Sequence, residues 1–596
     1  MIKLLKYLKS KDWIFIFISL LFIVCQVWLD LKLPDYMSDI TALIQTPNAE
    51  MIEIWKAGGK MLVCALGSLI ASVIVGYFIS GIAAGLSKTL RSNIFRKVES
   101  FSMHEINQFS VPSLITRSTN DITQVQMIIA MGLQVLIKAP ITAVWALGKI
   151  SSTSWQWTTA TAVAVVALLI VVSGSFLLAL PKFKIIQTLT DNLNKVAREN
   201  LTGIRVVRAY NAEKYQEDKF EKANDEITKT NLFTGRVMGI LMPFIQIIMS
   251  GLSLSIYWIG AYLINDVSIQ NPADVVNRFS VFSDMVVFSS YAIQVVIAFM
   301  MLVIVFIMLP RAQVAANRIN EVLDTPLTII NGTRKSDEEA QVGEIEFKNV
   351  YFKYPDAESS TDYVLENINF KVNKGETIAF IGATGSGKST LINLIPRFYD
   401  VTSGEVLVNG VNVKEYDKNY LTNKIGYVSQ RTVMFSGTVE SNVSYGDNGK
   451  EKLGIDAVKR AVEIAQGKDF VEKLEKQYES EVAQGGTNLS GGQKQRLSIA
   501  RAIHRDPEIY IFDDSFSALD YRTDKVLRAV LNKETKGKTK LIVAQRIGTI
   551  KDADKIVVLD EGKIVGIGKH KELLKTCEVY REIAYSQLSK EELENE

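Results

Sequence analysis

The sequence predicts a membrane protein of two parts, a helical transmembrane domain followed by an α/β domain outside the membrane. Long apolar runs crowd the first half of the chain, and strand-like runs alternate with helical ones in the second half. Hydrophobic residues make up 48% of the 596 residues, and the mean hydropathy is +0.14. The chain is too apolar for an ordinary soluble enzyme and too long for one domain.

Six apolar runs are each long enough to cross a bilayer, which takes about 20 residues of helix. They are centred within residues 13–33, 60–83, 127–149, 157–180, 237–264 and 284–309. No run of this length follows Arg311. We therefore predict a transmembrane domain with six spans over 1–320, a polar linker over 321–342 and an α/β domain over 343–596.

The placement of charge predicts the orientation of these spans. The segments between spans two and three and between spans four and five are long and basic, whereas residues 34–55 carry acidic side chains and no Lys or Arg. The positive-inside rule therefore puts the N-terminus, both long loops and everything after span six in the cytoplasm. Both loops have a helical pattern, so we expect the spans to continue beyond the membrane and to turn in short crossing segments near 102–113 and 203–212.

The remaining composition excludes several classes of protein. The net charge is only +3, which argues against a nucleic-acid binder. The three cysteines, Cys25, Cys64 and Cys577, form no CxxC pair, so neither a disulfide framework nor a zinc site is predicted. The basic N-terminus precedes a run of near full span length, and we interpret that run as a retained first helix after a short interfacial segment.

Residues 382–390 read GATGSGKST and fit the phosphate-binding pattern GxxxxGK[ST], between an apolar strand and an amphipathic helix. Backbone N–H groups of such a loop surround phosphates at a helix N-terminus, the Lys388 ammonium adds charge, and the Ser389 hydroxyl binds Mg²⁺. Asp513 ends a buried strand and would bring a carboxylate to the same Mg²⁺. The predicted nucleotide-binding residues of these two elements are Gly382, Thr384, Gly385, Ser386, Gly387, Lys388, Ser389, Thr390 and Asp513.

Residues 489–493 read LSGGQ and lie between the phosphate loop and Asp513, where Ser490 and the glycine N–H groups can cap a helix aimed at an anion. With this motif the chain resembles an ABC transporter over nearly its whole length, of the exporter type with the membrane domain ahead of the ATP-binding cassette. The resemblance implies a type IV exporter fold, with an all-α six-helix transmembrane domain and an α/β P-loop nucleotide-binding domain. It also implies ATP and Mg²⁺ as cofactors, and two cassettes that dimerise head to tail. The signature residues that would contact ATP on the partner are Leu489, Ser490, Gly491, Gly492 and Gln493.

Further roles follow from the resemblance alone. Tyr354, in YFKYP, would stack on adenine, although without the family a structural aromatic residue is the better interpretation. Gln430, in YVSQ, would bind Mg²⁺ and link that site to the membrane domain. The D-loop would consist of Ser517, Ala518, Leu519 and Asp520.

The sequence departs from the family pattern at three positions. Asp514 stands where most members have the Glu that activates water, and Gln545 stands where they have a His that contacts the γ-phosphate. Gln484 stands where the exporter pattern usually has a Glu before the signature, and the sequence does not show whether this change favours or opposes activity. A carboxylate displaced by about an ångström can lose about a hundredfold in rate, and an amide offers no titratable nitrogen.

These departures predict a degenerate, weakly hydrolytic ATP site and a heterodimer whose other chain supplies the hydrolytic residues, as in heterodimeric bacterial multidrug exporters. The alternative is drift in a slow homodimer. Among other classes of protein, a nucleotide-gated channel or a regulatory ABC subunit remains an alternative function. An importer is disfavoured because importers usually keep the membrane and ATPase parts on separate chains.

Polar residues inside the spans are candidates for a substrate cavity, because such residues usually face a bundle interior. They are Gln134, Lys138, Gln246 and Gln294. For Lys138, pairing with a neighbouring helix or with the partner chain is the alternative. The Met- and Phe-rich sixth span suits hydrophobic or amphipathic cargo of the multidrug type, and equally suits lipid contact. The resemblance places the protein in the cytoplasmic membrane of a bacterium.

Overall fold

The computed structural model describes residues 1–45, 50–151, 155–266, 272–337, 342–355, 363–449, 451 and 453–588. The chain divides into two compact units. The first consists of residues 1–97 and 112–325, and the second of residues 98–111 and 326–596. A short segment from the first half of the chain therefore belongs to the second unit.

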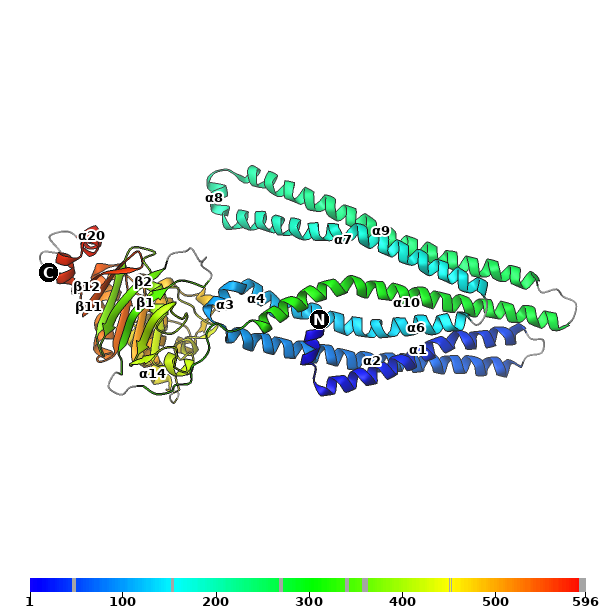
Figure 1. Ribbon diagram of the computed structural model, residues 1–596, viewed down its shortest axis with the longest axis horizontal. Coiled ribbons are helices and arrows are strands. Elements are labelled where there is room, and N and C mark those ends of the chain that lie inside the picture. The colour runs from blue at the N-terminus through cyan, green and yellow to red at the C-terminus, as the bar shows by residue number, and fades with distance from the viewer. Residues whose placement is uncertain are drawn as a thin grey trace. The chain divides into compact units, whose positions relative to one another are not determined.

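The first unit is a bundle of long helices (Figure 1). Its elements are η1 (Ile2–Tyr7), α1 (Ser10–Gln45), α2 (Met51–Glu99), α4 (Val111–Ser118), α5 (Asn120–Met127), η2 (Ile128–Gly132), α6 (Leu133–Ser151), α7 (Trp155–Thr202), α8 (Ile204–Ala209), α9 (Glu213–Asp266) and α10 (Pro272–Asp324). Within the described part of the chain, six helical segments are apolar and long enough to cross a membrane, which confirms the predicted six-helix transmembrane domain.

The helices pack through stripes of apolar residues. In α2 the buried positions Ala71, Val75, Ile79 and Ile82 recur every three or four residues, which places them on one face of the helix. The central cluster of the bundle joins α2, α7 and α10 through residues that include Trp157. Because lipid surrounds the rest of such a helix, an apolar residue there needs no protein partner.

Helices α2 and α9 are each longer than a bilayer requires. At the α-helical rise, the 49 residues of α2 and the 54 residues of α9 each span more than about 70 Å. The hydrocarbon core of a bilayer is only about 30 Å thick. Short helices, α3 (Met103–Phe109) and α8, lie at the two predicted crossing segments. In Figure 1, α7 and α9 run side by side, and the end that carries α8 projects away from α6 and α10.

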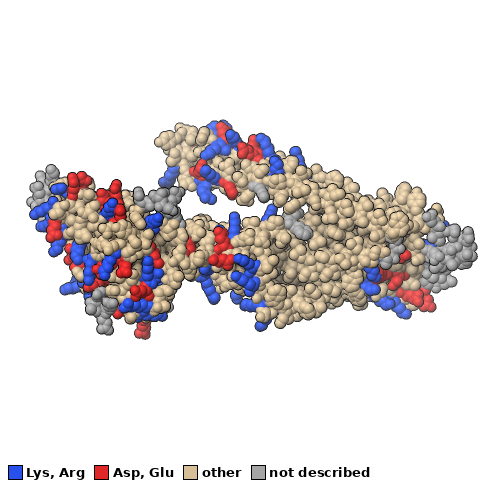
Figure 2. Space-filling view, in the orientation of Figure 1, with Lys and Arg blue, Asp and Glu red and all other residues tan. Residues whose placement is uncertain are grey.

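Charged side chains are unevenly distributed over the bundle. Figure 2 shows a long stretch of its surface without Lys, Arg, Asp or Glu, and charged residues gathered toward its ends. This distribution is the one that a bilayer requires, because an exposed charge in the hydrocarbon region is costly.

The second unit is an α/β domain built on two main sheets. A six-stranded sheet has the order β12-β11-β3-β10-β9-β6, in which only β12 is antiparallel to its neighbour, and a four-stranded antiparallel sheet has the order β2-β1-β4-β5. The strands are β1 (Ile345–Phe352), β2 (Leu365–Val372), β3 (Thr377–Gly382), β4 (Ser403–Val408), β5 (Val411–Asn412), β6 (Ile425–Val428), β7 (Gly437–Thr438), β8 (Glu481–Val482), β9 (Ile509–Asp513), β10 (Thr539–Val543), β11 (Lys555–Asp560) and β12 (Lys563–Gly568).

Helices pack on these sheets. One apolar cluster joins the four-stranded sheet to one face of the six-stranded sheet, and a second cluster joins the other face of the six-stranded sheet to helices. Besides α3, the helices are α11 (Lys388–Asn393), α12 (Lys418–Asn423), α13 (Val439–Val443), α14 (Ile455–Ile464), α15 (Lys468–Val471), η4 (Gln477–Glu479), η5 (Gln484–Gly486), α16 (Gly491–His504), α17 (Tyr521–Glu534), α18 (Ile547–Ile550), α19 (His570–Thr576) and α20 (Glu578–Gln587). The α/β class predicted for this half of the chain is confirmed. Part of the predicted linker, residues 338–341, lies outside the described residues, and the three predicted domain limits stay predictions.

The parallel register of the large sheet brings the chemistry-bearing residues together. Val543 of β10 pairs with Phe380 of β3 on one side and with Asp513 of β9 on the other. The carboxyl ends of three strands therefore meet at one edge, which is where open parallel sheets bind ligands.

Candidate nucleotide-binding site

The phosphate loop connects β3 to α11 and has a backbone that only glycine fits at two points. A side chain on Gly382 would put its Cβ 2.0 Å from the carbonyl oxygen of Leu559. Gly387 has φ of +93° directly before α11, and a Cβ there would lie 2.7 Å from the Leu365 side chain. The loop can therefore curl tightly and bring its N–H groups together at the start of the helix, where they can bind a phosphate.

The Lys388 ammonium lies inside this loop. Its Nζ donates to the carbonyl oxygens of Gly382 at 2.9 Å and Ala383 at 2.6 Å, and to Ser386 Oγ at 3.2 Å. Burial lowers the pKa of Lys388, while Asp514 and Asp513 act in the opposite direction. The ammonium thus supplies the positive charge that a phosphate group needs at this loop.

Ser389 and Asp513 form the oxygen-rich side of the site. The Ser389 hydroxyl donates to Asp513 Oδ1 at 2.8 Å, and Asp513 is only 5% exposed. Burial raises the pKa of Asp513, the Ser389 hydrogen bond lowers it, and neighbouring Asp514 raises it further. A hydroxyl and a carboxylate at this spacing fit Mg²⁺, which takes one or two protein oxygens and completes its shell with water and phosphate oxygens. Among the described residues no group of three or more His, Cys, Asp or Glu residues could hold another metal.

Asp514 holds the two glutamines of the site. Its Oδ2 accepts a hydrogen bond from Gln545 Nε2 at 3.0 Å and one from Gln430 Nε2 at 3.4 Å, and its main-chain oxygen accepts from Ser517 at 2.9 Å. Asp514 has φ of +46°, a left-handed conformation that a short polar side chain adopts more readily than a long one. Burial raises its pKa, and the Gln430 and Ser517 hydrogen bonds lower it.

A cavity of about 220 Å³ lies between these elements. It brings together residues predicted from four separate stretches of sequence, and it adds two apolar residues that sequence reasoning missed. Its lining consists of Val364, Thr384, Gly385, Gly387, Lys388, Ser389, Thr390, Gln430, Asp513, Asp514, Val543 and Gln545. The pairing of Val543 with Asp513 in the sheet explains the position of one of the missed residues.

Tyr354 lies beside the phosphate loop, two residues after β1. Its hydroxyl and Thr390 Oγ1 share a hydrogen bond of 2.9 Å. Its ring makes edge contacts with Phe352, with centroids 5.0 Å apart, and with Tyr399, with centroids 5.2 Å apart. Sequence reasoning missed Tyr399, because the sequence alone does not show that it lies next to Tyr354.

The LSGGQ segment lies outside this cavity. Ser490 caps α16, its hydroxyl accepting from Gln493 N at 3.3 Å while Gln493 Oε1 accepts from Ser490 N at 2.8 Å. None of the five signature residues lines the cavity. In the D-loop, Leu519 is buried and Asp520 caps α17 by accepting from Thr523 N at 3.0 Å, while Ser517 and Ala518 are exposed. Gln484 begins η5 and is exposed.

The bundle holds the other predicted residues. Lys138 Nζ donates to Asp30 Oδ2 on α1 at 3.1 Å, and Asp30 also accepts from Ser68 on α2. This contact is the interhelical pairing that the sequence left open for Lys138. Gln246 donates to Ser250 on its own helix at 3.3 Å, and both Gln134 and Gln294 are half-buried.

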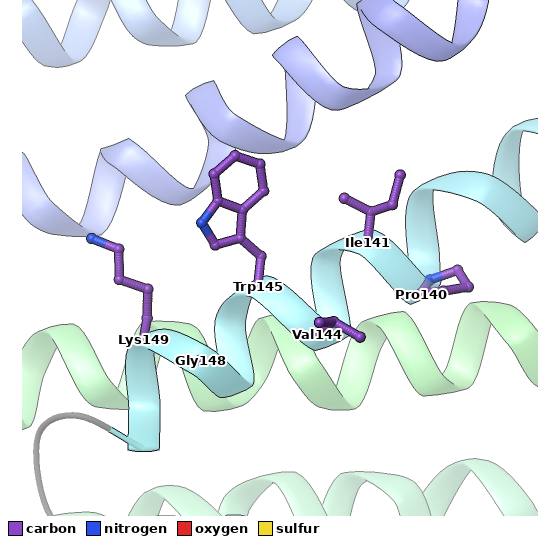
Figure 3. A pocket seen from close by; sticks show the side chains of 6 residues that line it. All are labelled: Pro140, Ile141, Val144, Trp145, Gly148 and Lys149. Carbon is purple, nitrogen blue, oxygen red and sulfur yellow. The ribbon is translucent and has the colours of Figure 1, made fainter.

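A cavity of about 670 Å³ lies along α6 and uses different residues from the four predicted ones. In Figure 3 the side chains of Ile141, Trp145 and Lys149 extend from one side of α6, as their four-residue spacing requires. Lys149 Nζ also donates to Asp35 Oδ2 on α1 at 3.0 Å. The lining is completed by Pro140, Val144 and Gly148.

Comparison with known proteins connects both units to one family. Residues 16–276 match the family model described as ABC transporter transmembrane region, and residues 365–517 match the family model described as ABC transporter. An uncharacterised ABC transporter ATP-binding protein of Mycobacterium tuberculosis is 37% identical over 552 residues, which are 92% of this chain and 90% of the relative. An ATP-dependent lipid A-core flippase of Hahella chejuensis is 30% identical, over 98% of this chain and 97% of the flippase.

The fold of the whole chain also has a solved counterpart. A bacterial Atm1-family ABC exporter with ATP bound superposes with a TM-score of 0.77, over 96% of this chain and 98% of that one. The two sequences are 21% identical, so this likeness shows the fold alone.

Proposed function

Because the chain belongs to the ABC transporter family, with a transmembrane region and an ATP-binding domain in one polypeptide, we propose that it is one half of a heterodimeric exporter whose own ATP site is degenerate. Family membership makes it a component of an ATP-driven exporter. The proposed cargo is hydrophobic or amphipathic compounds of the multidrug type. The proposed location is the cytoplasmic membrane of a bacterium, with the N-terminus and the ATP-binding domain in the cytoplasm.

The main observation that supports a degenerate site is the position of Asp514. Its carboxylate is one methylene shorter than that of Glu, and its Oδ2 accepts hydrogen bonds from the amides of Gln545 and Gln430. A general base must reach the attacking water, and misplacement by about an ångström costs about a hundredfold in rate. Gln545 adds an amide where an imidazole would stabilise the transition state. Hydrolysis at this site is therefore slow.

Retention of ATP is supported by the rest of the site. Lys388, Ser389 and Asp513 keep the charge and the oxygens that hold a Mg²⁺-bound triphosphate. Tyr354 offers an aromatic ring beside the loop for the base. The replaced Glu and His would act in the cleavage of ATP, whereas the residues that are kept act in binding it.

Two exposed features support a partner chain. The LSGGQ segment lies apart from the cavity of its own chain, as expected if it completes the partner's site. The α8 end of the α7–α9 pair exposes apolar and aromatic side chains, with Tyr210 79% exposed and Val206 61% exposed. Exposed apolar groups of this size on a cytoplasmic extension favour an interface.

The test is ATP turnover with and without the partner. The chain is purified alone and together with a co-expressed second ABC chain that has Glu and His at the two catalytic positions. We expect brisk turnover only from the pair, and we expect Asp514→Ala to leave the turnover of the pair within about twofold. Brisk turnover by the chain alone, abolished by Asp514→Ala, would contradict the proposal and favour a homodimer.

Export is tested separately, against a nucleotide-gated channel. Inside-out vesicles that contain the pair are given a lipophilic fluorescent dye at equal concentration on both sides. We expect ATP-dependent accumulation of the dye inside the vesicles. ATP-dependent ionic conductance without accumulation of the dye would point to a channel.

A further inference from the structure

The short helix α3 belongs to the second unit and is anchored there at its N-terminal end. Glu105 is 1% exposed and accepts from Ser102 N at 2.6 Å, Thr328 N at 2.7 Å and Thr328 Oγ1 at 2.7 Å. These hydrogen bonds outweigh the cost of burial and hold the pKa of Glu105 at about 2. Because Thr328 follows α10, this end of α3 is fixed to the segment that joins the bundle to the ATP-binding domain.

Farther along α3, the hydrogen bond of the Asn107 side chain is much weaker. Asn107 Nδ2 donates to the hydroxyl of Tyr399 at 3.4 Å, which is the long end of the hydrogen-bonding range. A contact of this length can tighten or break with small shifts of either partner. The N-terminal end of α3 is thus anchored by hydrogen bonds, and Phe109 at its other end is buried against Phe101. The exposed Asn107 side chain between them is in a position to respond to Tyr399.

Tyr399 connects this contact to the nucleotide site. Its ring lies edge-on to the ring of Tyr354, at 5.2 Å and 86°, and also contacts Phe352 at 5.7 Å. The hydroxyl of Tyr354 shares a hydrogen bond with Thr390 in the phosphate-loop helix α11. A continuous row of four residues therefore runs from α3 to the phosphate loop, through Asn107, Tyr399, Tyr354 and Thr390.

We propose that Tyr399 is a positioning residue that relays occupancy of the adenine position to α3, by a row of contacts that does not include Gln430. The proposal rests on the proposed function, in which Tyr354 meets the adenine. A base stacked on Tyr354 restricts the rotation of its ring and therefore restricts the neighbouring Tyr399 ring. The Tyr399 hydroxyl is then held toward Asn107, and the hydrogen bond to α3 shortens. ATP in this way favours one position of α3, because only that position gains the contact.

The relay has a consequence for the membrane domain because of where α3 lies in the chain. It connects α2 to α4 and α5, and α2 continues through the first unit as one helix. A slowly hydrolysed ATP would hold the α3 contact for as long as it stays bound. The degenerate site would then report occupancy to the transmembrane helices without cleaving its nucleotide.

The experiment measures hydrogen exchange of the α3 amides in the full-length chain, with and without a nonhydrolysable ATP analogue and Mg²⁺. Variants are Tyr399→Phe, which keeps the ring and loses the hydroxyl, Asn107→Ala, and the double variant. Tyr427→Phe is the matched control, because Tyr427 donates to Asn393 Oδ1 at 3.0 Å and makes an edge contact with Phe398 in the same unit. Affinity for the analogue is measured in parallel for every variant.

In the unsubstituted chain we expect the analogue to slow exchange in α3. Tyr399→Phe and Asn107→Ala should each lose about two- to tenfold of this protection, the range that one net hydrogen bond supplies. The double variant should lose no more than either single variant, since both remove the same contact. Analogue affinity should stay within about threefold, because ordering the contact uses only part of the binding energy. The Tyr427→Phe control should keep full protection.

Nucleotide-dependent protection that survives in both Tyr399→Phe and Asn107→Ala would overturn the relay. Equal loss of protection in Tyr427→Phe would also overturn it, since the effect would then come from general loosening of the unit. Tyr354→Ala tests the adenine-stacking role separately from the relay. Unchanged analogue affinity in Tyr354→Ala would refute the adenine-stacking role itself, whereas weakened affinity together with an intact response in Tyr399→Phe would refute the relay alone.

Discussion

Gln545 Nε2 lies 3.0 Å from Oδ2 of Asp514, so the two residues that we predict to weaken hydrolysis contact each other. The amide of Gln545 donates to the very carboxylate that would have to accept a proton from water. The two departures act on one hydrogen bond, and reversing only one of them leaves the other in place.

Restoring both residues should therefore restore cleavage. Asp514→Glu combined with Gln545→His should raise hydrolysis at this site by at least about tenfold, because a positioned general base contributes about 10²- to 10⁴-fold. Either single substitution should gain less. The measurement is single-turnover ATP hydrolysis by the assembled pair with the partner's own site inactivated. The same double variant with Lys388→Ala should lose the gain, and the absence of any gain would contradict the assignment of these positions.

Mg²⁺ dependence should be confined to the oxygen-rich side of the site. Ser389→Ala should retain ATP binding without Mg²⁺ and lose most of the increase in affinity that Mg²⁺ gives, because the Ser389 hydroxyl and Asp513 carboxylate supply the protein oxygens. The measurement is equilibrium binding of a fluorescent ATP analogue with Mg²⁺ or with a chelator. Ser444→Ala is the control, since its hydroxyl donates to the main-chain oxygen of Glu440 in the same unit and Ser444 does not line the cavity. A full Mg²⁺ response in Ser389→Ala would show that the ion lies elsewhere.

The stability contributed by Glu105 should depend on pH. Its pKa is lowered from 4.5 to about 2 by the hydrogen bonds of Ser102 and Thr328, so the stabilisation is complete above pH 4.5 and is lost as pH falls toward 2. At pH 7, Glu105→Gln should lower the free energy of unfolding by about 1–3 kcal/mol. Thermal unfolding in detergent from pH 7 to pH 3 should show the difference between the two proteins shrinking below pH 4.5. A difference that does not change with pH would mean that the carboxylate charge has no part in the contact.

The Lys138 pair should behave as a structural contact. Lys138→Met leaves Asp30 with Ser68 but without its cation, and should destabilise the bundle by about 1–3 kcal/mol. Lys138→Met with Asp30→Asn should recover most of that loss, which thermal unfolding of the four proteins in a double-mutant cycle would show. Dye accumulation by the double variant should match that of the unsubstituted chain. Restored stability with lost accumulation would instead indicate that Lys138 lines the substrate path.

Much of the fold could be predicted from the order of residues because the signals are local. Each span is a continuous apolar run, and the α/β class follows from short alternating segments. The phosphate loop is likewise a contiguous motif, and Lys388 and Ser389 lie where its pattern places them. The identities of Asp514 and Gln545 could also be read directly, and they suffice to predict a weakly hydrolytic site.

Contacts between distant segments could not be predicted in this way. Asn107 and Tyr399 are 292 positions apart, and Lys138 and Asp30 are 108 apart, so no periodicity relates them. The candidate cavity on α6 uses Trp145 and Lys149 rather than the polar residues that composition alone selects.

The sequence by itself determined the six spans, the phosphate loop and the residue types at the two positions predicted to be catalytic, because each is encoded in neighbouring residues. Only the tertiary structure decided that Gln430 and Gln545 converge on one oxygen of Asp514, and that α3 belongs with the ATP-binding domain. The register of β9 against β10 and the packing of α3 on the segment after α10 bring these groups together. Such non-local pairings follow from how the whole chain buries its apolar surface, and no short stretch of sequence specifies them.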